Sequence, residues 1–181
     1  MKKRYALPIV SSSLFFALTF AFSPVHAQQA SKLSDAEVAS VALTANQIDI
    51  DQAQIAIKKS TNADILNFAK TMANDHKAVI DQAVALATKL KVSPQTNDVT
   101  KKLLTGAEKT KQQLEAKTGK EFDKAYINNE VAYHKAVIDA VENLLIPETE
   151  NAELKALLQS IVPALKTHLS HAEMLQKTLA Q

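Results

Sequence analysis

Glycine is almost absent from this chain, and its scarcity is the feature that most limits the folds available to it. Only Gly106 and Gly119 occur among the 181 residues. Runs of β-branched residues are few, whereas long stretches consist of Ala, Leu, Lys, Gln and Glu, which are strong helix formers. The sequence therefore predicts an all-α protein.

Capping and breaking residues divide the chain into five predicted helices. Ser34 with Glu37 has the pattern of a capping box, and Asn151 is a typical N-cap before the last helix. Pro147 is expected to end the fourth helix, and Pro163 to kink the fifth. The predicted helices span residues 35–59, 63–91, 97–117, 119–146 and 152–179.

The N-terminus has the pattern of a secretory signal peptide. Basic residues at positions 2–4 precede an apolar run, and Val25 and Ala27 are the small residues expected before a cleavage site. The run is short for a membrane span, which needs about 20 residues. We therefore expect a signal peptide at 1–27, cleaved after Ala27, and a bundle domain at 28–181, with a retained anchor helix as the alternative. This predicts export, most simply to the periplasm of a Gram-negative bacterium, and no transmembrane segment in the mature chain.

Charge and cysteine content exclude several classes of function. Removing residues 1–27 takes three of the 21 basic residues and none of the 19 acidic ones, which changes the formal charge from +2 to −1. Because Arg4 is the only arginine, nucleic acid is not an expected partner. Zero cysteines exclude disulfides, thiol nucleophiles and iron–sulfur clusters. No other partner is identified, and a homo-oligomer stays open.

Four long helices and one shorter helix predict a four-helix bundle made of two helical hairpins. The shorter helix at 97–117 would then be the crossover between the hairpins. Spacings of three and four residues place His76, His134 and His168 on the apolar seams of the second, fourth and fifth helices. Three histidines are thus expected in the core.

Three stretches of the sequence resemble a known family. They are LSDAEVASVALTANQIDIDQAQIAIKKSTNADILNFAKTMANDH, GKEFDKAYINNEVAYHKAVID and NAELKALLQSIVPALKTHLSHA. They are similar to the exported, ferritin-like proteins of domain-of-unknown-function family 4142, and the resemblance covers about residues 33–178. It implies a ferritin-like bundle in the bacterial envelope, and it implies no activity.

The segment HKAVID occurs twice, at residues 76–81 and 134–139. A different repeat indicates that the two hairpins are duplicates of each other: STNADILNFAK begins the second helix of the first hairpin, and TENAELKALLQ begins that of the second. The second predicted helix then corresponds to the fifth, so the HKAVID copies lie on helices that are not equivalent. The crossover nevertheless makes these two helices parallel, and their histidines should lie at similar depth. The cluster predicted at this depth consists of Asp49, His76, Glu130, His134 and His168, with His171 one turn further along the last helix.

Two interpretations of this cluster compete. In one, the neutral imidazoles of His76, His134 and His168, with His171 as a further candidate, and either Glu130 or Asp49 bind a transition metal such as zinc, copper or iron. In the other, each histidine donates a ring N–H to a nearby acceptor, and the buried polar residues fix the helix register. Asp75, next to His76, could orient an imidazole, but adjacent helix residues face about 100° apart, so we expect it to be a solvated acid.

The di-iron pattern of ferritin-like proteins is incomplete. It requires Glu-x-x-His on two helices, but Ala73 and Leu165 stand three residues before the histidines at 76 and 168. A ferroxidase or di-iron oxygenase is therefore disfavoured. Met174 could add a soft copper ligand, although we expect it at the rim. The sequence favours an exported protein with a non-enzymatic binding or structural role, and the alternative is a redox-active transition-metal-binding protein.

Overall fold

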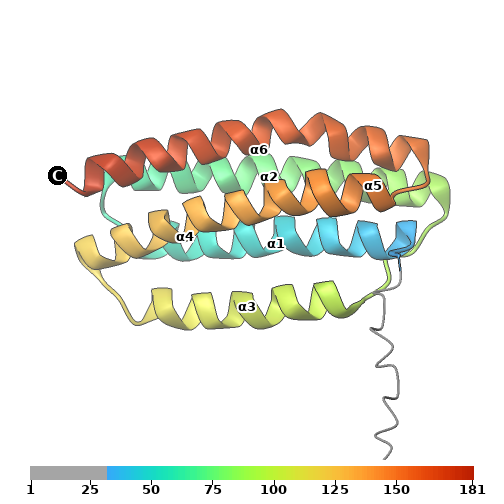
Figure 1. Cartoon of the computed structure of the whole chain (residues 1–181). Helices are drawn as coiled ribbons and strands as arrows, with labels where there is room; N and C mark the ends of the chain where they lie inside the picture. The colour runs from blue at the N-terminus through green and yellow to red at the C-terminus, as the bar shows by residue number, and fades with distance from the viewer. Residues whose placement is uncertain (1–31) are drawn as a thin grey trace, which may run out of the picture. The chain divides into compact units, whose positions relative to one another are not determined.

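The computed structural model describes residues 32–181, and the predicted signal peptide lies outside the described residues. All regular structure in this part of the chain is helical (Figure 1). The elements in order are α1 Asp35–Lys59, α2 Ala63–Leu90, α3 Asp98–Glu115, α4 Gly119–Ala140, the π-helical turn η1 Val141–Leu145, α5 Ile146–Glu148 and α6 Ala152–Leu179. The predicted all-α class is confirmed. Between residues 32 and 181, no helix combines the length and the apolar character needed to cross a membrane.

The long helices begin where their capping residues predicted. Ser34 Oγ accepts a hydrogen bond from the Glu37 amide at 3.3 Å, and Glu37 Oε2 accepts one from the Ser34 amide at 2.9 Å. Asn151 Oδ1 accepts from the amides of Glu153 and Leu154, both at 3.0 Å. These bonds satisfy amide groups that have no partner inside the helix. The starts of α1 and α6 are therefore determined locally by sequence.

The start of α4 requires a glycine. Gly119 has a φ of +56°, in the left-handed region that side chains disfavour. Thr118, which precedes it as N-cap, makes no side-chain cap bond. The conformation of Gly119 thus provides the turn from α3 into α4.

Pro147 does not end the fourth helix as expected. The helical backbone passes from α4 through the π-helical turn η1 and continues as α5 to Glu148. The Ile146 amide donates to the Val141 carbonyl, the wider spacing of a π-helix. Pro147 then falls in the first turn of α5, directly after the π-helical turn.

The helices form two hairpins joined by a crossover, as predicted. α1 packs along α2, and α4 packs along α6; the pairs meet through contacts of α1 with α4 and of α2 with α6. α3 lies outside the four long helices, along α1 (Figure 1). α2 and α4 therefore occupy one diagonal of the bundle and run in the same direction.

A buried polar layer divides the apolar core into two clusters. It consists of Asp49, His76, Glu130, His134 and His168. One apolar cluster contains Ala53, Ile65, Phe68, Met72, Leu114, Phe122, Tyr126, Ile127, Ala172 and Leu175, among others. The other contains Val38, Val41, Ile138, Val141, Leu145, Leu154, Leu158 and Leu165. On α1, α4 and α6 the chain passes from one cluster to the other through this polar layer.

Candidate metal centre

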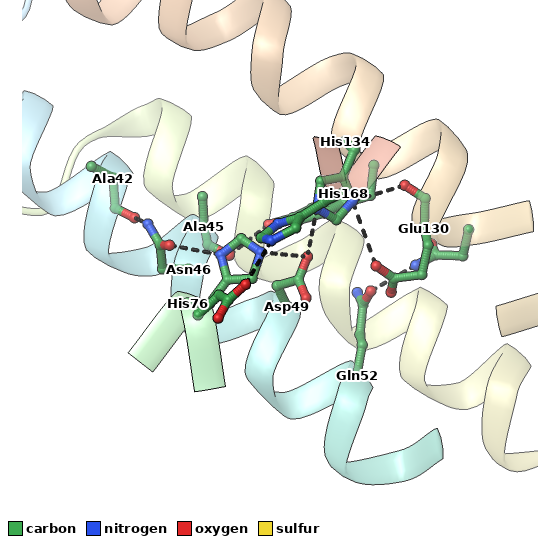
Figure 2. A network of polar contacts seen from close by, with 12 residues as sticks. Ala42, Ala45, Asn46, Asp49, Gln52, His76, Glu130, His134 and His168 are labelled. Atoms are coloured by element: carbon green, nitrogen blue, oxygen red, sulfur yellow. Dashed lines mark hydrogen bonds and ion pairs between the residues drawn. The ribbon is translucent and has the colours of Figure 1, made fainter. Parts of the chain in front are cut away.

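Each of the four long helices contributes to the polar layer (Figure 2). Asp49 comes from α1, His76 from α2, Glu130 and His134 from α4, and His168 from α6. Asp49 and Glu130 are fully buried, and no histidine of the layer is more than 6% exposed. The three imidazole ring centroids lie 5.3 to 5.7 Å apart. The bundle therefore brings together five of the six predicted site residues.

Two groups of three within the layer are close enough to share an ion. The first is His76, His134 and His168, and the second is Asp49, Glu130 and His134. In each group, one potential ligand atom per residue lies within 4.8 Å of the others. His134 belongs to both groups and stands at the centre of the layer.

His76 is oriented by an amide side chain of α1. Its Nδ1 lies 2.7 Å from Asn46 Oδ1, and Asn46 Nδ2 donates to the Ala42 carbonyl at 2.8 Å. Because this second bond turns the amide oxygen toward the ring, Nδ1 is assigned as the protonated nitrogen. Nε2 then carries a lone pair into the layer, 3.5 Å from Asp49 Oδ2.

His134 is oriented by its own helix. Its Nδ1 donates to the Glu130 carbonyl at 3.0 Å. This bond assigns the proton to Nδ1 and leaves the lone pair on Nε2, which lies 3.7 Å from Asp49 Oδ2. The inward nitrogens of His76 and His134 therefore face the same carboxyl group.

His168 is oriented by a carboxylate of α2. Its Nε2 donates to Asp75 Oδ2 at 3.0 Å, and its Nδ1 is buried without a partner. A histidine that binds a metal usually donates its other ring N–H to a carboxylate, carbonyl or amide oxygen. All three histidines of the layer meet this condition, each through a different acceptor.

The inward atoms of the layer have no hydrogen-bond partners. They are both carboxyl oxygens of Asp49 and Glu130, Nε2 of His76 and His134, and Nδ1 of His168. Buried polar atoms are normally paired, so a group of unpaired atoms at one depth requires an explanation. Seven acceptor or donor atoms thus converge on one region while the outward side of each imidazole is satisfied.

Burial keeps the imidazoles of His76 and His134 neutral. Loss of solvent lowers the pKa of His76 to about 3, with smaller effects of His134 and His168. It also lowers the pKa of His134 to about 4, against the opposing effect of its bond to the Glu130 carbonyl. The contacts of these rings with Asp49 are therefore not ion pairs at neutral pH, and the ring nitrogens keep the lone pairs that metal binding needs.

Burial has the opposite effect on the acids. It raises the pKa of Asp49 to about 7 and that of Glu130 well above its usual value, where the charge of Asp49 adds a smaller contribution. The pKa of Tyr126 is also raised, first by burial and then by these two carboxyls. A cation in the layer would replace the protons that Asp49 and Glu130 otherwise hold.

Two further candidate ligands, His171 and Met174, lie outside the polar layer. His171 does not join either group, because it lies one turn beyond His168 on α6 and its ring packs edge-on against Phe68, with centroids 5.1 Å apart. His171 thus lies one turn from the layer, as predicted, and the structure does not bring it to either group of potential ligands. Met174 is 58% exposed, as expected for a rim residue.

Sequence reasoning did not identify the partners that orient His76 and His168. Asp75 is exposed, as expected of a solvated acid, and it also accepts the hydrogen bond of His168 from the neighbouring helix. Asn46 was not considered at all. Its position three residues before Asp49 on α1 is the only sequence feature that could have indicated it, since both then lie near the same helix face.

A family model described as a domain of unknown function (DUF4142) matches residues 21–175. The chain belongs to this family. A search of curated proteins found no match for this DUF4142 chain. Among solved structures it is similar to CopM in the Cu(II)-bound form, with a TM-score of 0.60 and 16% sequence identity over 81% of this chain and 98% of that chain. At this identity the similarity shows the helical fold that the two share.

Proposed function

We propose that this protein is a non-enzymatic binder of a transition metal ion, held by the inward nitrogens of His76, His134 and His168. The observation that carries the proposal is the asymmetry of the three rings. Each outward N–H is bonded to an acceptor, whereas each inward nitrogen is buried and unpaired. The imidazoles are thus already in the tautomers that a metal requires.

The donor set favours a borderline cation. Imidazole nitrogens suit zinc, copper and iron, and Asp49 adds a hard oxygen beside the triad. Three nitrogens bound to one ion at about 2 Å lie about 3.4 Å from one another, so potential ligand atoms that now lie within 4.8 Å of one another would have to move closer on binding. CopM is described in a Cu(II)-bound form, which makes copper(II) the first metal to test. The low number of carboxylates continues to disfavour a di-iron centre.

The competing proposal is a purely structural polar layer that fixes the helix register. Such a layer would gain most if its members were bonded to one another, because an unpaired buried polar atom costs about 1–3 kcal/mol. Here the inward atoms are unpaired although His76 and His134 both lie within 4 Å of Asp49. This arrangement favours a ligand over a register device.

The experiment is elemental analysis of untagged protein, with the variants His76→Ala and His134→Ala and with His171→Ala as the matched control. We expect about one ion per chain in the wild type and in the control, and a large loss in the other two, because three ligands define the site. Little metal in the wild type, unchanged by the substitutions at 76 and 134, would contradict the proposal.

Thermal unfolding separates the two proposals. A metal that binds only the folded state raises the melting temperature, and a chelator lowers it again. If the layer is structural, substitutions at 76 and 134 lower the melting temperature while metals and chelators have no effect on it.

We further propose that the protein is exported, with a signal peptide at 1–27 and the bundle domain at 28–181. The basic residues, apolar run and small residues before position 28 support this proposal. Mass spectrometry of the exported protein should show Gln28 as the first residue. An intact N-terminus on protein from the cell envelope would contradict it.

A further inference from the structure

The crossover helix α3 is attached to the bundle near its N-terminus by polar contacts. Asn97 Nδ2 donates to the Glu37 carbonyl at 3.2 Å, and the hydroxyls of Ser40 and Thr100 lie 3.4 Å apart. Thr100 is only 3% exposed. This end of α3 is therefore held close to α1.

The other end of α3 is attached by an apolar side chain. Leu114 is 1% exposed and belongs to the apolar cluster that contains Phe68. Lys59 Nζ also donates to the Glu115 carbonyl at 2.6 Å. Thr100 and Leu114 are the only buried residues of α3, so the helix is held at two points and is more exposed between them.

A cavity of about 370 Å³ lies beneath the middle of α3. Leu103, Gly106 and Ala107 of α3 form its cover, and α1 and α4 form its sides with mainly small and aliphatic residues. Asp49, His76 and His134 also line it, which places the polar layer at its inner end. The cavity thus leads from the crossover helix to the candidate metal centre.

We propose that this cavity binds a small aromatic molecule with one hydrogen-bond-donating head, oriented with its apolar body under α3 and its head toward Asp49. Ligand pockets are typically apolar, with a few polar groups converging at one point, and have volumes of about 300–1,000 Å³. This cavity has that composition and a volume near the lower limit.

The size and chemistry of the ligand follow from the lining. A cavity of about 150 Å³ accommodates benzene, so a two-ring molecule of about a dozen non-hydrogen atoms fits here. The polar end offers acceptors, since both oxygens of Asp49 are buried and unpaired. A hydroxyl or ring N–H on the ligand would give one of these oxygens a partner. This argument uses only the lining of the cavity and the unpaired oxygens of Asp49, so the inference does not rest on the proposed metal function.

The test is titration of the purified protein with 1-naphthol, followed by the fluorescence of the ligand. The chain contains no tryptophan, which limits the background to tyrosine. 1-Methoxynaphthalene is the matched ligand, because it has the same rings and no O–H donor. We expect its affinity to be about tenfold lower, the effect of losing one hydrogen bond to a buried acceptor.

Cavity-filling variants locate the site. Gly106→Leu is well tolerated by geometry, because a Cβ at Gly106 meets no atom within 4 Å and leucine is a better helix former than glycine. Ala107→Phe fills the same cover from the next residue. The control is Thr105→Leu, an exposed position on α3 that does not line the cavity. We expect the Kd for 1-naphthol to rise by about tenfold or more in both filling variants and to change by less than about twofold in the control.

Three outcomes would overturn the inference: no saturable binding of 1-naphthol, equal affinity for 1-methoxynaphthalene, or unchanged affinity in filling variants whose melting temperatures show that they fold. Metal content is measured on the same samples. Wild-type protein that binds 1-naphthol but no metal contradicts only the proposed function. Wild-type protein that binds metal but no 1-naphthol contradicts only this inference.

Discussion

Replacing Asp49 with asparagine should stabilise the metal-free protein at alkaline pH. The carboxyl is fully buried, both of its oxygens are unpaired, and burial raises its pKa from 3.8 to about 7. A carboxyl with a raised pKa in the folded state keeps its proton longer when folded. Stability therefore falls as the pH rises from about 4 to about 7, and the loss is complete above that range.

The magnitude follows from the pKa values. They differ by about three pH units, and each unit corresponds to about 1.4 kcal/mol, so ionisation of Asp49 costs the folded state about 4 kcal/mol. Asparagine has nearly the same shape and cannot ionise. We therefore compare the unfolding free energy of Asp49→Asn with that of wild type at each pH. The variant's advantage should be about 4 kcal/mol larger at pH 8 than at pH 4.

The assay is urea unfolding at both pH values in the presence of a chelator. Asp51→Asn is the matched control, because Asp51 is an exposed acid on the same helix and its replacement should change stability by less than about 0.5 kcal/mol. With a saturating metal, wild type should be more stable than Asp49→Asn if Asp49 contributes a ligand. A difference in unfolding free energy between Asp49→Asn and wild type that is the same at both pH values would refute the argument.

Two other substitutions test the surroundings of the layer. Asn46→Leu should lower metal affinity by about 10- to 100-fold, because it removes the acceptor that fixes the tautomer of His76. Competition with a chelator measures the affinity. An equal loss of metal affinity in the exposed control Gln47→Leu would contradict the reason given. Phe68→Ala should lower the unfolding free energy by about 3–5 kcal/mol, since the ring is fully buried. A loss below about 1 kcal/mol in urea unfolding would show that the apolar cluster containing Phe68 contributes less than its burial implies.

Helix positions were predictable because their causes are local. The capping box of Ser34 and the N-cap Asn151 act within four residues, so the starts of α1 and α6 could be located from sequence. The π-helical turn η1 was missed, since the segment VENLL has no residue that distinguishes a π turn from an α turn. Pro147 was misinterpreted for the same reason, because its effect depends on the preceding turn.

The site was predictable only in part because two of its three orienting bonds, those of His76 and His168, cross between helices. Seam positions and matched depth were enough to bring His76, His134 and His168 together. The bond from His168 to Asp75 depends on how α6 rotates against α2, which the spacing of apolar residues does not determine to within one residue. The position of His171 one turn along α6 was predictable from its spacing, but its contact with the ring of Phe68 on α2 was not.

The two sides of each imidazole give the strongest argument about the layer. The outward nitrogens are bonded to an amide of α1, a carbonyl of α4 and a carboxylate of α2, so these bonds orient all three rings before any ligand arrives. Preorganised ligands lose little freedom on binding, which raises affinity. A layer that served only to align helices would gain nothing from leaving its inward atoms unpaired between the two apolar clusters. It would also lose stability through the ionisation of Asp49. A bound cation would compensate for both costs at once, because it supplies a partner to the lone pairs and stabilises the ionised carboxylate.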